Sequence, residues 1–270
     1  MDPAAYVEMD AIEARHWWFR GKRRLLAPLV ERMLASDERM LASDGRMLAS
    51  ETSSRAVLEI GCGTGGNLAH FAPRHADVRF VGLDFDQAAC AFAQAKCAPD
   101  GTALLRGDGL RLPFADASLD GALALDIIEH FDDDQALCRE LLRVLRPGAS
   151  LVLSVPAWPS LWSPHDEVLH HKRRYRPAEL RALIQGAGFE VAETRGFNFL
   201  LLPPIWLVRR LKARGQARSG GAPEGTDFFD LPRPLNALLA GLFAVEAALV
   251  RALPIRWGVS IMVRARKPGA

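Results

Sequence analysis

The stretch Val57-Leu58-Glu59-Ile60-Gly61-Cys62-Gly63-Thr64-Gly65-Gly66-Asn67 is an apolar run that leads into a glycine-rich turn. Such a run before glycines predicts a buried strand, followed by the start of a helix. Gly61, Gly63 and Gly66 satisfy the G-x-G-x-x-G pattern of dinucleotide-binding turns, which alone is weakly specific. Glu59 would repel a pyrophosphate but suits an ammonium group. The stretch therefore predicts a nucleotide-like ligand that carries positive charge.

Short apolar runs alternate with helical segments beyond this stretch, which predicts a parallel sheet wrapped by helices. Pro147-Gly148 is expected to end the helix before the fifth strand. The expected strands are Ala56–Ile60, Phe80–Asp84, Ala103–Gly107, Leu119–Leu125 and Ser150–Val155.

Three more acidic residues stand at or just after the ends of predicted strands, where ligands of open α/β sheets bind. Asp84, about twenty residues beyond the glycine turn, suits ribose hydroxyls. Asp108 suits an exocyclic adenine amine, or alternatively an N-cap within its loop. Together with Glu59 and Asp126, these carboxylates favour a positively charged nucleoside, and S-adenosylmethionine fits that description.

These motifs resemble those of class I S-adenosylmethionine-dependent methyltransferases, in particular the type 11 and type 23-like small-molecule group. The resemblance implies a Rossmann-like, doubly wound, mostly parallel seven-stranded sheet with an antiparallel last strand. Its last two strands are expected at Phe189–Gly196 and Gly258–Arg266. The matching segments are Val57–Gly65, Val81–Asp84, Gly107–Gly109, Leu112–Phe114 and Leu145–Ala149.

On this mapping the chain has a helical N-terminal cap at 1–54, a core at 55–196 plus 257–270, and a helical insertion at 197–256. The first region holds a seven-residue repeat that spaces Leu26, Met33, Met40 and Met47 evenly. We expect a surface helix lengthened by duplication, since Ser-Asp in each copy is a poor helix former. The alternative, a coiled coil, needs more heptads.

The resemblance also implies which residues bind the cofactor. Glu59, Gly61 and Gly63 are expected to contact the methionine part, and Asp84 with Phe85 the ribose. Asp108 with Gly109 is expected to contact the adenine, and Asp126 with Ile127 to lie beside the sulfonium.

Methyl transfer gains much of its rate from alignment, and a base helps when the acceptor is a hydroxyl or a protonated amine. His130 is one candidate base. The segment from Asp126 to His130 resembles a metal-binding pattern of ubiquinone-type and small-RNA O-methyltransferases, with Asp126 in place of the usual glutamate. We therefore expect no metal, and keep Asp126, Glu129 and His130 as the alternative ligand set.

The long segment after the fifth strand offers two further candidate bases, His165 and His171. Trp162, Arg174 and Tyr175 are expected to bind substrate, with the arginine suited to a phosphate or carboxylate. The alternative is that the arginines tie this loop to core carboxylates. The pattern resembles a methyltransferase subgroup linked to cell-envelope or lipid-associated metabolism.

Near the N-terminus, His16, Trp17 and Trp18 precede a basic run and are expected to close over cofactor or substrate. Aromatic and basic residues together also suit RNA. We do not expect nucleic acid, because no nucleic-acid motif accompanies them and the formal net charge is only +2.

The insertion at 197–256 contains two apolar segments that are interrupted by prolines or charges, so neither is expected to span a bilayer. We favour a lid or dimer surface packed on the domain. The alternative is a pair of helices in a membrane interface that admit a lipid-linked acceptor.

The function expected from these features is methyl transfer from S-adenosylmethionine to a small-molecule or lipid-linked acceptor, with oxygen favoured. Alternatives are an RNA, N- or C-methyltransferase, a non-catalytic S-adenosylmethionine-binding regulator, and a nicotinamide oxidoreductase. The four cysteines show no paired spacing, and no signal-peptide pattern is present. We expect a cytoplasmic protein, peripheral to the inner membrane if the insertion meets lipid.

Overall fold

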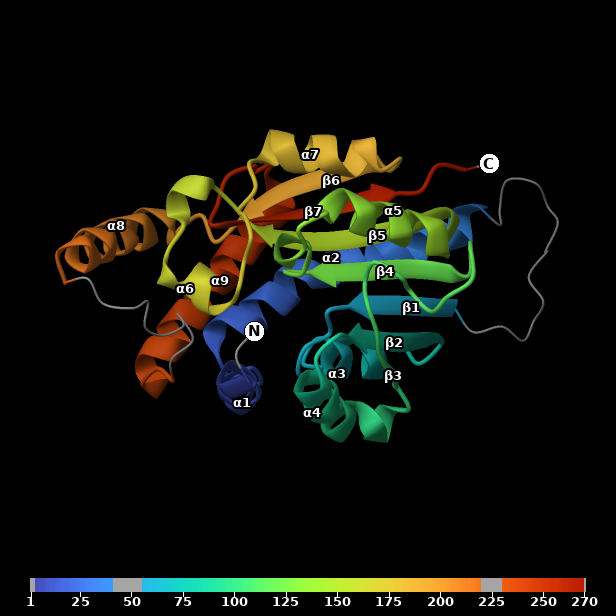
Figure 1. Cartoon of the computed structure of the whole chain (residues 1–270), viewed down its shortest axis with the longest axis horizontal. Coiled ribbons are helices and arrows are strands. Elements are labelled where there is room, and N and C mark those ends of the chain that lie inside the picture. Colours follow the sequence, from blue (N-terminus) through green and yellow to red (C-terminus); the bar gives the residue numbers. More distant parts are fainter. Residues whose placement is uncertain (1–2, 41–54, 220–229, 270) are drawn as a thin grey trace.

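The computed structural model describes residues 3–40, 55–219 and 230–269. Its centre is a seven-stranded sheet of order β3-β2-β1-β4-β5-β7-β6 (Figure 1). Neighbours among the first five strands are parallel, and β7 is antiparallel to both β5 and β6. The strands are β1 (Arg55–Ile60), β2 (Val78–Asp84), β3 (Ala103–Arg106), β4 (Leu119–Leu125), β5 (Leu145–Pro156), β6 (Glu190–Phe197) and β7 (Ser260–Arg266). The predicted fold class, with its antiparallel final pair, is confirmed.

Helices cover both faces of this sheet. On one face, α5 (Asp134–Val144) and α7 (Pro177–Gly186) bury their apolar sides in the first core cluster. On the other face, the second cluster takes residues from α2 (Trp17–Met40), α3 (Leu68–Phe71), α4 (Gln87–Cys97) and α9 (Arg233–Ala252). The remaining α-helices are α1 (Pro3–Ile12), α6 (Pro164–Val168) and α8 (Leu202–Ser219).

Helix α2 is a layer of the core, so the packing does not follow the expected division at residue 54. Leu26 and Met33 of the seven-residue repeat are buried, and Met33 packs where Gly121 of β4 leaves room for it. The repeat therefore faces the sheet as far as Met33. The side chain of Met40 and all of Met47 lie outside what the structure describes.

Strand β5 corrects the expected boundary at Pro147-Gly148. The helix before it ends at Val144, and the strand already begins at Leu145. The pairing register between β5 and β4 shifts between Leu119 and Gly121. The extra residues of β5 therefore form a bulge that includes Gly148, whose φ is +84°. A proline is tolerated at such a bulge, which explains why it does not mark the end of the helix.

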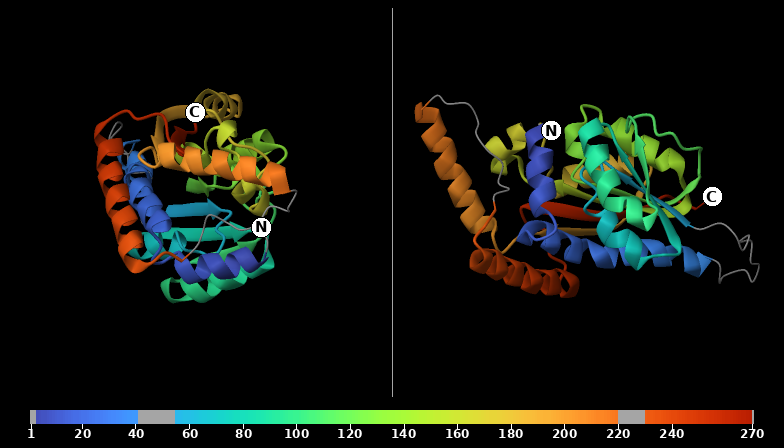
Figure 2. Two further views of the ribbon diagram at one scale, coloured as in Figure 1. Left: turned by 90° about the vertical axis from the view of Figure 1, so that its left-hand side faces the viewer. Right: turned by 90° about the horizontal axis from the view of Figure 1, so that it is seen from below.

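The insertion lies between β6 and β7, as expected, and consists of α8 and α9. Glu246 of α9 is buried and accepts hydrogen bonds from the backbone N–H groups of Asn198 and Leu200, just after β6. Both helices lie at the end of the molecule where the parallel strands point (Figure 1, and Figure 2, left).

Candidate active site

A cavity of about 510 Å³ opens at the carboxyl ends of the parallel strands. Loops after β1, β2, β3 and β4 line it from the sheet, while α1, α2 and α8 line it from outside. It contains most of the predicted site residues, namely His16, Trp17, Trp18, Gly61, Gly63, Asp84, Phe85, Asp108, Gly109, Asp126, Ile127, His130, His165, His171 and Arg174.

The glycine loop after β1 contains three glycines in the left-handed backbone region, Gly61, Gly63 and Gly65. Gly61 has φ +66°, and a Cβ there would lie 2.5 Å from the Ile127 side chain. Gly63 has φ +53°, and its N–H donates to Oδ2 of Asp84 over 2.9 Å. Only glycine combines this backbone shape with such close approach. The loop is therefore held against the end of β2 with its backbone facing the cavity.

Asp84 presents a carboxylate that is largely buried but reaches the cavity. Its Oδ1 accepts a hydrogen bond from the Asp86 N–H at 2.9 Å. Burial raises the pKa of Asp84, and the backbone N–H groups partly counter this. Phe85, 73% exposed, and Asp108 extend the same wall. A carboxylate beside an open aromatic face suits a ribose and its base.

Glu59 is buried beneath the glycine loop and does not line the cavity itself. Oε1 accepts a hydrogen bond from Nδ2 of Asn67 at 2.8 Å, whereas Oε2 has no partner among the described residues. Burial raises the pKa of Glu59 to about 7, despite the hydrogen bond from Asn67. A buried carboxylate oxygen without a donor is costly, and a cationic group arriving here would satisfy it. This property fits the ammonium of S-adenosylmethionine, as the resemblance implies.

Asp126 forms a partly buried ion pair with Lys22 of α2. Its Oδ2 lies 2.5 Å from Nζ of Lys22, and its Oδ1 accepts a hydrogen bond from Oγ of Ser154 at 2.8 Å. Burial acts to raise the pKa of Asp126, but the charge and hydrogen bond of Lys22 outweigh it, so that pKa is lowered. Asp126 is therefore an ionised carboxylate that forms an ion pair with Lys22.

A second buried cluster lies at the other end of the cavity, on the loop after β5. Asp166 accepts hydrogen bonds from Nδ1 of His171 at 2.9 Å and from Nε of Arg174 at 2.8 Å. Burial acts to raise the pKa of Asp166, yet His171 and Arg174 hold it below its usual range. Since an ionised carboxylate only accepts, Nδ1 of His171 carries the proton. Nε2 is the ring nitrogen that does not contact Asp166.

Glu129 and His130 complete this cluster. Both carboxyl oxygens of Glu129 are buried without a hydrogen-bond partner in the described chain, and Oε1 lies 3.9 Å from Nε2 of His171. Burial, and then the charge of Asp126, raise the pKa of Glu129 well above its ordinary value. Burial, and then His171, lower the pKa of His130 to about 3, so His130 is a neutral ring.

Glu129, His130 and His171 each place one potential metal-ligand atom within 4.8 Å of the other two. This group differs from the alternative set that the sequence suggested, because Asp126 is engaged by Lys22 and Ser154. Two imidazoles and one carboxylate are suitable metal ligands in principle.

Helix α1 and the start of α2 close the cavity over the glycine loop. Glu13 accepts a hydrogen bond from Oγ1 of Thr64 at 2.8 Å and pairs with Lys96 of α4. Trp17 and Trp18 line the cavity and also pack on Phe243 of α9, with ring centroids 5.5 and 5.7 Å apart. The aromatic residues therefore join the cavity to the insertion.

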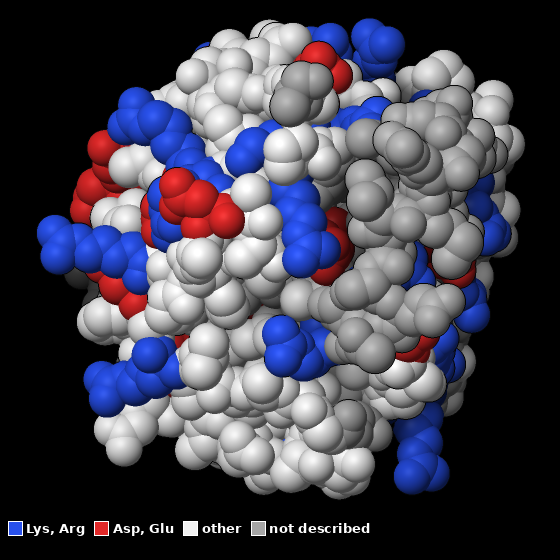
Figure 3. Space-filling view, turned by 90° about the vertical axis from the view of Figure 1, so that its right-hand side faces the viewer, with Lys and Arg blue, Asp and Glu red and all other residues white. Residues whose placement is uncertain are grey.

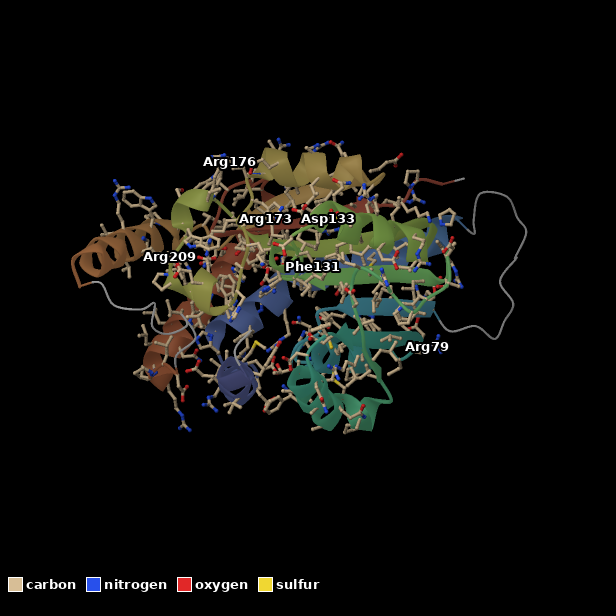
Figure 4. The ribbon with its side chains drawn as sticks, viewed as in Figure 1. Arg79, Phe131, Asp133, Arg173, Arg176 and Arg209 are labelled. Carbon is tan, nitrogen blue, oxygen red and sulfur yellow. The ribbon has the colours of Figure 1, made fainter. Side chains whose placement is uncertain are left out.

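Three predicted site residues do not line the cavity. Glu59 lies below the loop as described, and Trp162 does not reach the cavity lining. Tyr175 is buried in the first core cluster, where its hydroxyl donates to Oδ2 of Asp134 at 2.8 Å. Arg173 pairs with the same carboxylate at 2.9 Å (Figure 4). These contacts agree with the alternative in which this loop is tied to core carboxylates.

Several cavity residues were not predicted from the sequence. Lys22 belongs to the basic run after Trp17 and Trp18, from which no partner in the core was predicted, and no role was predicted for Asp166. Ile205 and Arg209 of α8 also line the cavity, and Arg209, labelled in Figure 4, donates a hydrogen bond to the Leu161 carbonyl. The order of charges along the chain carries no signal for these long-range pairings.

Comparison with known proteins identifies the central part of the chain. Residues 58–153 match the family model described as a methyltransferase domain. A probable S-adenosylmethionine-dependent methyltransferase of Mycolicibacterium smegmatis is 37% identical over 148 residues, which cover 53% of this chain and 55% of that protein. The O-methyltransferase rstn1 of Aspergillus nomiae is 33% identical over 148 residues, covering 51% and 65%. The chain thus spans about half to two thirds of the length of these relatives.

Among solved structures, a methyltransferase in complex with the Haloferax volcanii methyltransferase activator Trm112 has the same fold. Its TM-score is 0.52 at 20% identity, with 96% of this chain and 97% of that chain covered. The matched segment includes the glycine loop, Asp84, Asp108 and Asp126, and these residues surround one cavity. Residues 58–153 therefore match a methyltransferase domain, and the predicted resemblance to class I S-adenosylmethionine-dependent methyltransferases is confirmed.

Proposed function

We propose that the protein transfers the methyl group of S-adenosylmethionine to an oxygen atom of a small-molecule or lipid-linked acceptor. The observation that carries this proposal is that one cavity joins the glycine loop and Asp84 to the His171–Asp166 pair. A pure binding site for the cofactor needs only the first of these. The second adds a proton acceptor on the side where an acceptor molecule would enter.

The residues of this chain suit the cofactor. Asp84 offers a carboxylate for ribose hydroxyls, and the buried carboxyl of Glu59 lacks the donor that an ammonium group supplies. When bound, S-adenosylmethionine supplies a methyl group that is already activated by its positive sulfur.

His171 is the group best placed to take a proton. Asp166 holds Nδ1–H, so Nε2 faces Glu129 and the cavity. In the proposed step, the acceptor oxygen forms a bond to the methyl carbon while the carbon–sulfur bond breaks. The hydroxyl proton passes to Nε2 of His171, and Asp166 stabilises the imidazolium that forms. The neutral ring of His130, 4.8 Å away by ring centroid, adds no opposing charge.

The decisive experiment combines binding with transfer. Calorimetric titration with S-adenosylhomocysteine tests the cofactor site, with NAD as the control ligand. Transfer of labelled methyl from S-adenosylmethionine into fractionated lipid, glycan and small-molecule extracts, with and without EDTA, then identifies the acceptor. Tight NAD binding with none of S-adenosylhomocysteine would overturn the cofactor. Cofactor binding without transfer into any fraction would favour a regulator, and product that is labelled on nitrogen would overturn the oxygen acceptor.

A further inference from the structure

Helix α9 is apolar on both sides although it is covered on only one. Its inner side buries Phe243, Ala247 and Val250, whereas Leu238 and Val245 on its outer side are 68% and 57% exposed. Surface helices of globular proteins normally carry polar residues on their outer face. By length and composition α9 is the one helix in the described chain that could cross a membrane, with a mean hydropathy of 1.6 and 22% of that window buried.

Helix α8, at the same end of the molecule, also exposes apolar side chains. Trp206, Leu207 and Val208 are exposed by 42%, 52% and 49%. The guanidinium of Arg210 lies 5.2 Å from the Trp206 ring centroid. Tryptophan, leucine and arginine in this order are typical of helices at the boundary between lipid tails and headgroups. The two helices converge at one end of the molecule (Figure 2).

The exposed charged side chains described on these two helices are basic, whereas Asp230, just before α9, is exposed and pairs with Arg15. Arg210, Arg233, Arg251 and Arg256 are exposed, and the only acidic residue within α9, Glu246, is buried. The insertion at 197–256 holds eight Lys or Arg residues and four Asp or Glu residues. Outside the grey atoms, the face at the other end of the sheet mixes basic and acidic side chains with neutral surface (Figure 3). Exposed apolar side chains among arginines complement anionic phospholipid headgroups.

Helix α9 is fixed to the domain along its length, so it is built to lie on a bilayer and not to cross one. Near its start, Oδ1 of Asn236 accepts a hydrogen bond from the Trp17 N–H at 2.8 Å. In its second half, Glu246 binds the N–H groups of Asn198 and Leu200. Crossing a bilayer would break these bonds and carry a carboxyl into hydrocarbon.

We propose that α8 and the outer side of α9 dock on an anionic phospholipid bilayer, and that the acceptor enters the cavity from that membrane. Arg209 and Ile205 of α8 line the cavity, and Nη1 of Arg209 donates to the Leu161 carbonyl at 2.7 Å. One helix thus reaches both the exposed surface and the cavity. The inference that the helices bind a membrane depends only on their exposed side chains. The inference that the acceptor enters from the membrane rests on the proposed function.

The test is flotation of the full chain with phosphatidylglycerol–phosphatidylcholine vesicles and with pure phosphatidylcholine vesicles. Wild type is expected to float with the anionic vesicles. Leu238→Glu with Val245→Glu is expected to lower binding at least about tenfold, because two apolar side chains no longer enter the interface. Arg251→Gln and Arg256→Gln are each expected to lower binding to the anionic vesicles about fivefold.

The matched control is Ala182→Glu with Gln185→Glu, which adds two carboxylates to exposed positions of α7 and is expected to float like wild type. Circular dichroism confirms that each variant is folded. Wild type that does not float with the anionic vesicles overturns the proposal. So does a solution dimer that Leu238→Glu with Val245→Glu converts to monomers, since the surface then joins two copies. S-adenosylhomocysteine titration of the same samples separates failure of docking from failure of the cofactor assignment.

Discussion

The carboxylate of Asp166 holds Nδ1 of His171 at 2.9 Å, inside the cavity that also contains the glycine loop. Arg174 donates to the same carboxylate oxygen and is itself 2% exposed at its side chain. The ring of His171 is therefore fixed in orientation and tautomer before any acceptor arrives. This preorganisation is what a base needs in order to act in a methyl-transfer step.

His171→Ala should lower kcat about 10²- to 10⁴-fold while the Kd of S-adenosylhomocysteine stays within about twofold. The reason is that His171 serves the acceptor and not the cofactor. Labelled-methyl turnover with the acceptor from the extract assay measures the first quantity, and calorimetry measures the second. If both change equally, His171 belongs to the cofactor site or to the fold.

Asp166→Asn should lower kcat similarly, because an amide no longer fixes the tautomer of His171. It should also lower the free energy of unfolding by about 3–5 kcal/mol, since the buried guanidinium of Arg174 loses the carboxylate with which it pairs. Lys172→Ala is the control on the same loop. Its pair with Asp132 is exposed, at 3.3 Å, so stability should change by less than about 1 kcal/mol.

Asp84→Ala should raise the Kd of S-adenosylhomocysteine at least about hundredfold, which corresponds to two hydrogen bonds to a charged group. The substitution also removes the acceptor of the Gly63 N–H, which in the wild-type protein donates to Asp84 at 2.9 Å. Asp77→Ala removes an exposed carboxylate that pairs with Arg55 and should leave binding unchanged. Equal affinity in Asp84→Ala and wild type would remove Asp84 from the ribose site.

The parallel sheet could be predicted from the sequence because each strand is a local apolar run. The ends of β2 and β4 also fix where Asp84 and Asp126 lie, since carboxyl ends of parallel strands meet at one edge. Lys22 could not be predicted in the same way. Nothing local distinguishes it from Arg20 or Arg24, and its burial depends on a carboxylate 104 residues away.

The sequence pattern also did not predict that α2 packs in the core. The Ser-Asp pairs of its repeat suggested a surface helix, whereas the apolar residues from Leu25 to Met33 belong to the second core cluster. Tyr175 illustrates the opposite error. Its place beside histidines and arginines suggested substrate, but its hydroxyl satisfies Asp134 in the core.

Binding of S-adenosylmethionine should release a proton near neutral pH. Burial raises the pKa of Glu59 from 4.5 to about 7, so below that pH the empty site holds a neutral carboxyl. A carboxyl with a raised pKa favours the folded state at low pH, and this stability is lost as pH rises from 4.5 to about 7. A bound ammonium group stabilises the carboxylate and reverses this effect.

The number of released protons can be measured by calorimetry of cofactor binding at about pH 6.5, repeated in buffers of different ionisation enthalpy. Glu59→Gln should abolish that release and weaken binding, while Glu129 remains as the other buried carboxyl. Proton release that persists in Glu59→Gln would assign it to another group.

Lys22→Met should lower the free energy of unfolding by about 2–4 kcal/mol, because Asp126 then keeps a mostly buried charge without its partner. The side chain of Lys22 is 9% exposed and that of Asp126 is 30% exposed. Lys22 lowers the pKa of Asp126, so the stability from this pair is present above the ordinary carboxyl pKa and lost as pH falls. The difference between wild type and Lys22→Met should therefore be largest above about pH 5 and shrink toward about pH 3. Urea unfolding across this pH range measures the difference in the free energy of unfolding. The control is Arg24→Met, an exposed neighbour on α2, which should be within about 0.5 kcal/mol of wild type. A difference that stays constant with pH would show that Lys22 acts through packing of its aliphatic stem and not through its charge.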